Sequence, residues 1–234
     1  MFNDAELDWS ATGAVSGQHR GDVEVDDICV EFLVSAGLSV FSEESGFTSS
    51  PKGDSLVVVL DPVDGSTNAS RSIPLFVISC ALVEKGTVTA GYVHELTNQA
   101  RYWSVRGEGA YFGSIPLGTE RVQRELRRSV VAVNGYPRSH FGWGQFRALG
   151  SAALELSMVA SGQLDGYVDC SRLGLAPWDY LGALAILREA GCAIDTLGDD
   201  VAPETDLYGT RRHVVAASSH ELLEQLRTAW SKAN

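Results

Sequence analysis

The sequence LVVVLDPVDGSTN spans residues 56–68. Its first five residues are apolar, and a run of that length is typical of a strand buried on both faces. Two acids, Asp61 and Asp64, follow directly, and Pro62 between them ends the hydrogen-bond ladder because proline has no N–H. Two acids at the end of a buried strand need partners for their charges. This stretch therefore indicates both a buried strand and a candidate binding site.

The two acids have two interpretations. One is an Asx-turn with exposed carboxylates, because Asp and Gly are common in turns. The other is a site for hard divalent cations, since oxygen ligands suit Mg²⁺. Gly65 permits a sharp turn, and Ser66 or Thr67 is expected to start a short helix whose free N–H groups favour an anion. Cations that bridge the acids to a bound phosphate would explain both features.

Two other acidic positions bear on this choice. Glu43 and Glu44 follow a predicted strand in the segment FSEESG, where they form either a solvated turn or part of the same site. Asp179 precedes an apolar helix and is well placed as its N-cap. An N-cap can also be a metal ligand, so these two roles do not exclude each other.

The remaining sequence predicts a layered α/β fold. Helices are expected at 27–36, 151–161, 179–190 and from Ser219 to about 230, and strands at 38–41, 56–60, 75–84, 87–94, 100–106, 129–133, 164–169, 192–196 and 214–217. In the first helix, Ile28, Phe32 and Leu33 share a face at helical spacing. The polar, basic segment 113–128 is the predicted boundary between an N-terminal lobe of about residues 1–120 and a C-terminal lobe of about 121–234, both within a single domain.

The composition is typical of a soluble globular protein, with 44% apolar and 21% charged residues. The net charge of −12 argues against nucleic acid and anionic membrane as partners. No apolar run reaches the ~20 residues that span a bilayer, and Met1–Trp9 does not resemble a signal peptide. The four cysteines are scattered, so we expect reduced thiols and a cytoplasmic protein.

The motifs LDPVDGSTN and WDYLGALAILREAG resemble the paired signatures of the inositol monophosphatase family. FSEESG resembles its upstream acidic motif, GDVEVDDICVE its first acidic helix, and GSAALELSMVASGQLDGYVD its substrate-side helix and strand. The resemblance extends from about Gly21 to the C-terminus. It implies an αβαβα sandwich of the sugar-phosphatase type, a homodimer, and a Mg²⁺-dependent, Li⁺-sensitive phosphatase that binds two to three ions.

The resemblance also implies roles for individual residues. The implied metal ligands are Glu43, Asp61, the carbonyl of Val63, Asp64 and Asp179, with Glu44 supporting a third ion through water. Ser66 stands where the family has a hydroxyl that pairs with an acid of the first helix to activate water. The spacing to Glu31 favours Asp27 as that acid, and Asp26 is the alternative.

Substrate recognition is expected from the turn after the buried strand and from the second half of the chain. The implied substrate-binding residues are Asp64, Gly65, Ser66, Gly150, Ser151, Ala152, Asp169 and Arg172. Gly65 and Ser66 would bind the phosphate through their N–H groups, and residues 150–152 would offer donors to substrate hydroxyls. Arg172 either meets a second phosphate or a sugar oxygen, or pairs with Asp169, or lies in solvent. Arg147 is either an additional cation near the site or an ordinary surface residue.

The sequence therefore predicts a Mg²⁺-dependent phosphomonoesterase for inositol monophosphate or a similar small polyol or sugar phosphate. The segment VDCSR loosely resembles archaeal phosphatases that act on both inositol phosphate and fructose bisphosphate. Alternative substrates are fructose 1,6-bisphosphate, histidinol phosphate and a 3′-phosphonucleotide, and a non-catalytic regulatory protein is the alternative of a different class. The segment Met1–Gln18 is shorter than the family's usual first helix, so packing or dimer contacts are expected to differ there.

Overall fold

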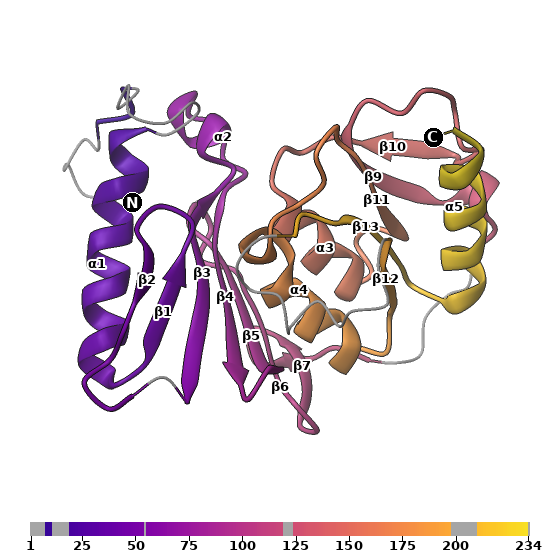
Figure 1. Cartoon of the computed structure of the whole chain (residues 1–234). Helices are drawn as coiled ribbons and strands as arrows, with labels where there is room; N and C mark the ends of the chain where they lie inside the picture. The colour runs from indigo at the N-terminus through magenta and orange to yellow at the C-terminus, as the bar shows by residue number, and fades with distance from the viewer. Residues whose placement is uncertain (1–7, 11–18, 54, 119–123, 198–209, 234) are drawn as a thin grey trace.

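The computed structural model describes residues 8–10, 19–53, 55–118, 124–197 and 210–233. Within these ranges the strands form two sheets, and helices lie between the sheets and on their outer faces (Figure 1). The layers therefore follow the order α, β, α, β, α, which confirms the predicted αβαβα sandwich. None of the helices in the described ranges is long and apolar enough to cross a membrane.

The first sheet has the strand order β2-β1-β3-β4-β5-β6-β7-β8. Its strands are β1 (Ser39–Ser42), β2 (Gly46–Thr48), β3 (Leu56–Asp64), β4 (Val77–Glu84), β5 (Thr87–Glu95), β6 (Arg101–Val105), β7 (Gly109–Phe112) and β8 (Ile115–Pro116). Only β1 and β3 pair in parallel in this sheet, with Ser42 opposite Leu60. Because parallel strands end at the same edge, residues that follow β1 lie beside the end of β3.

The second sheet has the strand order β10-β9-β11-β13-β12. Its strands are β9 (Val130–Gly135), β10 (Gln145–Arg147), β11 (Gly166–Cys170), β12 (Ala193–Leu197) and β13 (His213–Ala217). The chain passes from the first sheet to the second between Pro116 and Val130, through a short 3₁₀ helix at Leu126–Arg128. This transition falls in the segment where the sequence predicts a boundary between lobes.

Five α-helices in the described ranges complete the layers. They are α1 (Arg20–Ala36), α2 (Ser66–Ser70), α3 (Ala152–Ala160), α4 (Pro177–Glu189) and α5 (His220–Ala233). Helix α1 packs on β1 and β3, α3 and α4 lie between the sheets, and α5 covers the outer face of the second sheet (Figure 1). The short helix α2 follows β3 directly and begins where the sequence predicts a turn into a helix.

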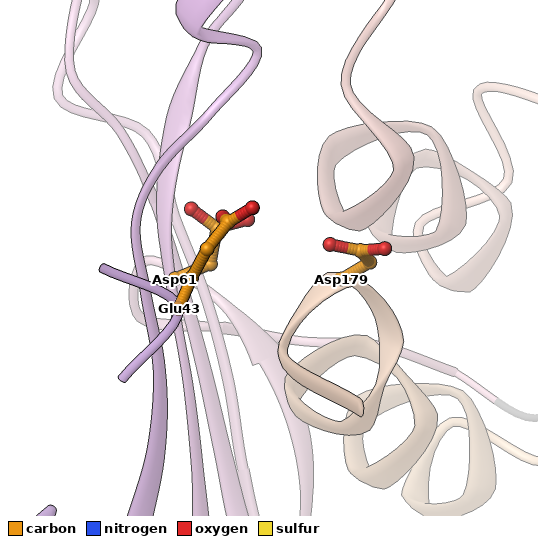
Figure 2. A group of neighbouring side chains, drawn as sticks. All are labelled: Glu43, Asp61 and Asp179. Carbon is orange, nitrogen blue, oxygen red and sulfur yellow. The ribbon is translucent and has the colours of Figure 1, made fainter. Parts of the chain in front are cut away.

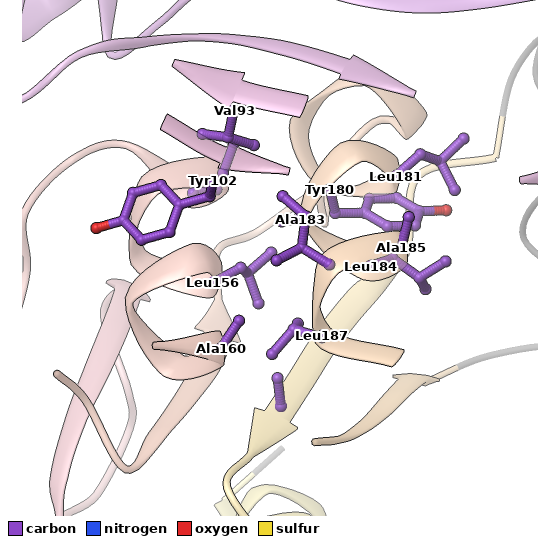
Figure 3. Close-up of a cluster of buried hydrophobic side chains, with 14 of the residues drawn as sticks. Val93, Tyr102, Leu156, Ala160, Tyr180, Leu181, Ala183, Leu184, Ala185 and Leu187 are labelled. Carbon is purple, nitrogen blue, oxygen red and sulfur yellow. The ribbon is translucent and has the colours of Figure 1, made fainter. Parts of the chain in front are cut away.

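The main hydrophobic core lies between the two sheets, around α3 and α4. Figure 3 shows Leu156 of α3 and Leu184 of α4 among the buried side chains of this layer. Helix α4 approaches β4 and β5 closely because a glycine stands at each contact. Gly91 of β5 faces α4, and Gly182 of α4 faces β4. A Cβ atom at Gly91 would lie 2.2 Å from the Gly182 carbonyl oxygen, and one at Gly182 would lie 2.7 Å from the Cys80 carbonyl oxygen. This close contact fixes the position of α4 against the first sheet.

Helix α1 differs from the prediction in its start and in its buried face. It begins seven residues earlier than the predicted residue 27. Leu33 packs toward the sheet, but Ile28 and Phe32 are 68% and 69% exposed. The helix rests on β1 and β3 through the side of Asp26, Cys29 and Leu33. Phe32 lies at the edge of this contact, where it lines a surface pocket together with Leu60 of β3. The predicted helix is confirmed, and of the three residues on that face Leu33 packs against the core while the other two remain exposed.

Candidate metal centre

Three carboxylates from distant parts of the chain meet between the first sheet and α4. Glu43 follows β1, Asp61 lies near the end of β3, and Asp179 lies in the first turn of α4. One oxygen from each of these side chains lies within 4.8 Å of the others. Figure 2 shows Glu43 and Asp61 on the side of the sheet, with Asp179 facing them from the helix. The parallel pairing of β1 and β3 explains why residues 43 and 61 lie together.

Local hydrogen bonds orient two of these acids. Asp61 is buried, and its Oδ1 atom accepts the N–H of Val63 at 3.0 Å. The Oδ2 atom of Asp179 accepts the N–H of Ala176 at 2.7 Å. Residue 176 is the N-cap and Pro177 the first helical residue, so Asp179 is the third residue of the helix and not its predicted N-cap. Proline is favoured at the first helical position because its fixed φ suits the helix.

Burial and the charges of neighbouring acids raise the pKa values of all three carboxylates. Burial is the largest cause for Asp61, whose pKa lies well above its usual range, and the charges of Glu43 and Asp64 add to it. Burial and the Glu43 charge likewise hold the pKa of Asp179 well above its usual range. Although Glu43 is partly exposed, lost hydration of its carboxylate and the charge of Glu44 raise its pKa to about 7. An all-carboxylate set whose charges oppose one another fits a hard divalent cation.

Asp64 lies beside this group but forms other contacts. Its Oδ2 atom accepts the Ser151 hydroxyl at 2.7 Å and the Ala153 N–H at 2.6 Å, and its Oδ1 atom accepts the Ala152 N–H at 3.3 Å. Its carboxylate thus binds the N-terminus of α3, where an anion is favoured by the free N–H groups and the helix dipole. Burial still raises its pKa to about 6. Its role as a metal ligand remains a prediction.

These contacts change the expectation for residues 150–152. The sequence predicts that donors of Gly150, Ser151 and Ala152 bind substrate hydroxyls. In the structure the Ser151 hydroxyl and the Ala152 N–H donate to Asp64, and the N–H of Leu149, just before Gly150, donates to Glu155 at 2.6 Å. The Ser151 hydroxyl and the Ala152 N–H are therefore already hydrogen-bonded to the carboxylate of Asp64, because a helix N-terminus favours a nearby anion.

The turn after β3 has the predicted form. Gly65 has a φ of 95°, and a Cβ atom at this position would lie 2.9 Å from the Leu75 carbonyl oxygen, so glycine is required. Ser66 starts α2. The Asn68 amide donates to the carbonyl oxygens of Leu75 and Leu149, both at 2.7 Å, and ties the turn to the entry of α3. Phosphate binding by residues 65 and 66, and ligation by the Val63 carbonyl, remain predictions.

The acids that α1 buries do not include the predicted Asp27. Asp27 is exposed, and Asp26 is buried and accepts a hydrogen bond from the Ser42 hydroxyl. Asp22 is also buried, accepts the N–H of His19 at 2.9 Å, and contributes to the raised pKa of Glu43. Among the described residues, the Oδ1 atom of Asp22 has no hydrogen-bond partner.

The spacing to Glu31 in the sequence favoured Asp27 as the water-activating acid and did not identify Asp22 as a candidate. A signal for Asp22 was present in the helical period, because residues 22, 26 and 33 fall on one face of α1. That face packs on the first sheet, so an acid in its first turn lies near the ends of β1 and β3. Helix α1 therefore buries Asp22 and Asp26 and leaves Asp27 exposed, and the identity of the water-activating acid remains a prediction.

Asp169 forms a closed hydrogen-bond network. It is fully buried, and its Oδ1 atom accepts the Asn134 amide and the Ser171 N–H, both at 3.0 Å. Its Oδ2 atom lies 2.9 Å from Nδ1 of His213. Contact of Asp169 with substrate hydroxyls remains a prediction. Arg172 is exposed in the following loop, and none of the ion pairs within the described ranges joins it to Asp169.

Arg211 lies at the metal centre, and sequence analysis did not identify it. Its Nη1 atom lies 3.9 Å from Oδ2 of Asp179 and donates to the Gly174 carbonyl at 3.2 Å. The backbone pairing of Leu175 with Arg212 brings this segment beside the start of α4. No local sequence pattern predicts that pairing. Arg147, by contrast, is exposed and binds Gln145 and the Phe146 carbonyl.

Comparisons with known proteins agree with this geometry. The model of the inositol monophosphatase family matches residues 22–233. A Thermococcus kodakarensis protein named fructose-1,6-bisphosphatase/inositol-1-monophosphatase is 32% identical over 216 residues, which cover 89% of this chain and 80% of that protein. Nus factor SuhB of Pasteurella multocida is 31% identical over 203 residues, which cover 80% of this chain and 72% of that protein.

A solved structure shows the same fold. It is a Pyrococcus horikoshii protein described as having similarities to inositol-1 monophosphatase. The TM-score is 0.81 with 28% sequence identity, and the match covers 94% of this chain and 88% of that chain. The residues that match the family model include Glu43, Asp61 and Asp179.

Proposed function

The chain belongs to the inositol monophosphatase family, and we propose that it is a Mg²⁺-dependent phosphomonoesterase. Its substrate would be inositol monophosphate or a similar small polyol or sugar phosphate, and two to three ions would bind. The observation that carries this proposal is the convergence of Glu43, Asp61 and Asp179 within 4.8 Å. Such a group is unstable when charged and empty, and a cation would relieve the repulsion.

The ions and the protein would divide the work. Bound Mg²⁺ would make an attacking water more acidic and offset charge on the phosphoryl and leaving-group oxygens. Glu43, Asp61 and Asp179 would hold the ions, with Asp64 and the Val63 carbonyl as further ligands and Glu44 acting through water. The N–H groups of Gly65 and Ser66 would orient the phosphate.

Asp22 would take the role that the sequence assigned to Asp27. In this proposal the Ser66 hydroxyl and the Asp22 carboxylate together orient the attacking water and accept its proton. The burial of Asp22, its unpartnered Oδ1 atom among the described residues and its effect on Glu43 support the assignment. The side chain of Asp27 is exposed, and Asp26, the other candidate, accepts a hydrogen bond from the Ser42 hydroxyl.

The alternative hypotheses concern the leaving group and catalysis itself. The name of the Thermococcus relative includes fructose-1,6-bisphosphatase, which supports that substrate as the second candidate. Histidinol phosphate and a 3′-phosphonucleotide remain further alternatives. A regulatory role is the alternative of a different class, and one relative is named a Nus factor. The assembled acids oppose a purely regulatory role, because binding without catalysis gives no reason to keep them together. Cytoplasmic location remains a prediction from the scattered cysteines, and a homodimer and inhibition by Li⁺ remain predictions from the resemblance.

A phosphate-release screen tests the proposal. The protein is incubated with Mg²⁺ and inositol 1-phosphate, fructose 1,6-bisphosphate, histidinol phosphate or a 3′-phosphonucleotide, and each reaction is repeated in EDTA. We expect Mg²⁺-dependent release from at least one of the sugar or polyol esters. Release that continues unchanged in EDTA, or in the Asp64→Asn variant, would contradict the mechanism.

A further inference from the structure

A cavity lies at the end of α4 that is remote from the metal centre. Asp179 lies in the first turn of this helix, and Arg188 lies in its last turn. At 1.5 Å per residue, residues 179 and 188 are separated by roughly 14 Å along the helix axis. The cavity has a volume of about 320 Å³. Because ligand pockets usually measure about 300–1,000 Å³, this volume suits a small ion or a small ester.

The cavity has a buried floor and a cationic rim. Val88 of β5, Ser104 of β6 and Ala185 of α4 line it and are buried. Arg106, which follows β6, and Arg188 also line it and are exposed. A ligand in this cavity would therefore lie between buried side chains and two guanidinium groups that solvent can reach.

The charge of the cavity is opposite to that of the whole chain. The chain has 30 acids and 18 Lys and Arg residues. Among the described residues that line the cavity, two are arginines and one is an acid, Glu189. The Oε2 atom of Glu189 accepts the N–H of Gly109 at 3.0 Å, so the backbone at the start of β7 already binds this carboxylate. The excess of cations favours a ligand with negative charge.

The end of α4 does not need Arg188 as a cap. The carbonyl groups at a helix C-terminus attract cations, so a basic residue in the last turn is often explained in that way. Here the carbonyl oxygens of residues 186–188 accept the backbone N–H groups of residues 190–192, at 2.9–3.1 Å. These carbonyl groups are satisfied without the arginine side chain, which therefore can serve a ligand.

Ser104 adds a buried hydroxyl to the floor of the cavity. Its side chain is 1% exposed, and among the described residues its Oγ atom has no hydrogen-bond partner. The hydroxyl of Thr89, which also lines the cavity, donates to the Leu82 carbonyl at 3.3 Å. A buried hydroxyl without an acceptor is unfavourable, and an oxyanion in the cavity would supply one. Guanidinium groups present planar sets of donors that match phosphate oxygens.

We propose that this cavity binds a small phosphate-type oxyanion, which is either inorganic phosphate or the phosphate group of a small ester. Arg106 and Arg188 would hold its charge, and Ser104 would donate a hydrogen bond from the floor. The site goes beyond the proposed function, because it is remote from the ion-binding acids and needs no metal ion. A phosphate ester bound there would be held without being hydrolysed.

Calorimetric titration of the full chain with inorganic phosphate tests this site. One titration contains Mg²⁺, and the other contains EDTA, which keeps the metal centre free of ions. In EDTA the acids of the metal centre repel an anion, so we expect saturable binding of one phosphate per chain in the cavity. Inositol 1-phosphate is titrated in the same way. Tighter binding of the ester would identify an ester as the ligand, and tighter binding of inorganic phosphate would identify the free ion.

Substitutions in the cavity locate the bound phosphate. Because a hydrogen bond to a charged group contributes enough for about a tenfold change in affinity, Arg106→Ala and Arg188→Ala should each weaken phosphate binding about tenfold. Ser104→Ala should weaken it about threefold, since it removes one neutral donor. Arg147→Ala is the matched control, because Arg147 is an exposed arginine that binds Gln145 and the Phe146 carbonyl. It should bind phosphate as the unmodified protein does, and thermal unfolding confirms that each variant is folded.

Different outcomes separate the failure of this inference from the failure of the proposed function. Absence of saturable phosphate binding in EDTA would overturn the site and leave the proposed function intact. Unchanged binding in the double variant Arg106→Ala/Arg188→Ala, or an equal loss in Arg147→Ala, would also overturn it. Unchanged binding in Ser104→Ala would overturn the placement of the anion on the buried floor. Binding in EDTA by a protein that releases no phosphate with Mg²⁺ would support the site and contradict the proposed function.

Discussion

Two buried acids at the ends of strands have opposite surroundings in this protein. Asp61 lies at the end of β3, which is parallel to β1, and Asp169 lies at the end of β11, which is parallel to β9. Asp169 is surrounded by potential donors from Asn134, Ser171 and His213. Asp61 accepts one N–H, from Val63, and otherwise faces the carboxylates of two other acids.

This difference teaches that burial at a strand end does not by itself identify a site. A buried carboxylate that is satisfied by donors stabilises the fold, since removing its partners would leave an unpaired charge. A buried carboxylate that faces other carboxylates lowers the stability of the empty protein and is favoured only when a cation binds. The predictions below test this contrast between Asp61 and Asp169.

The largest effect is expected for Asp61→Asn. The change removes a central oxygen ligand, so Mg²⁺-dependent phosphate release should fall at least about 10³-fold, because positioned charges of this kind are usually the largest catalytic contribution. The metal-free variant should unfold at a temperature equal to or higher than that of the unmodified protein, since one of three repelling charges is gone. Phosphate release and thermal unfolding without Mg²⁺ measure the two effects. A variant that keeps most of its activity would contradict the role of Asp61.

The next effect separates two acids of α1. Asp22→Asn should lower kcat by about 10²- to 10⁴-fold, the usual range for loss of a general base. Asp27→Asn is the matched control on the same helix, and we expect its kcat to stay within about twofold because surface changes rarely matter. Equal effects of the two substitutions on kcat would show that Asp22 has no special role. A pH profile that loses its acidic limb only in the Asp22 variant would sharpen the assignment.

Asp169→Asn should act mainly on stability. It replaces an acceptor that is shared by Asn134, Ser171 and His213. We expect the free energy of unfolding to fall by about 1–3 kcal/mol, the cost of leaving buried polar groups unsatisfied. Urea denaturation measures the loss, and activity of the remaining folded protein should change far less than in Asp61→Asn. A normal stability with a large loss of activity would instead return Asp169 to the substrate site.

The smallest effect is a dependence of stability on pH in the metal-free protein. The pKa is raised to about 7 for Glu43 and to about 6 for Asp64. A raised folded-state pKa means tighter proton binding in the folded state, so the stability that these groups contribute is present at low pH and is lost as pH rises through the raised values. The melting temperature should therefore fall between about pH 5 and pH 8 without Mg²⁺ and fall less with it. Glu43→Gln should flatten part of that decrease, and an equally steep decrease in this variant would contradict the role of Glu43.

The sequence predicted features that depend on local pattern. The strand before Asp61, the turn at Gly65 and the helix from Ser66 follow from apolar runs, proline and glycine. The αβαβα layers followed from the family resemblance. The parallel pairing of β1 with β3 places residues 41–46 beside residues 56–68, and α4 brings residues 178–191 to the same region by packing on the first sheet.

Features that depend on orientation or on distant donors could not be predicted in the same way. The choice between Asp22 and Asp27 depends on how α1 is rotated on the sheet. One of the polar contacts that satisfy the Asp169 carboxylate is with His213, which lies 44 residues away in the sequence. Arg211 reaches Asp179 through a single backbone bridge at residues 175 and 212 that has no sequence signature.

Calorimetric titration with Mg²⁺ tests the central claim that Glu43, Asp61 and Asp179 bind a divalent cation. The unmodified protein, Asp61→Asn and Asp169→Asn are titrated under the same conditions, and Ca²⁺ is used as a second cation. We predict Mg²⁺ binding to the unmodified protein and to folded Asp169→Asn, and its loss in Asp61→Asn. Equal Mg²⁺ binding by Asp61→Asn and the unmodified protein would contradict the account.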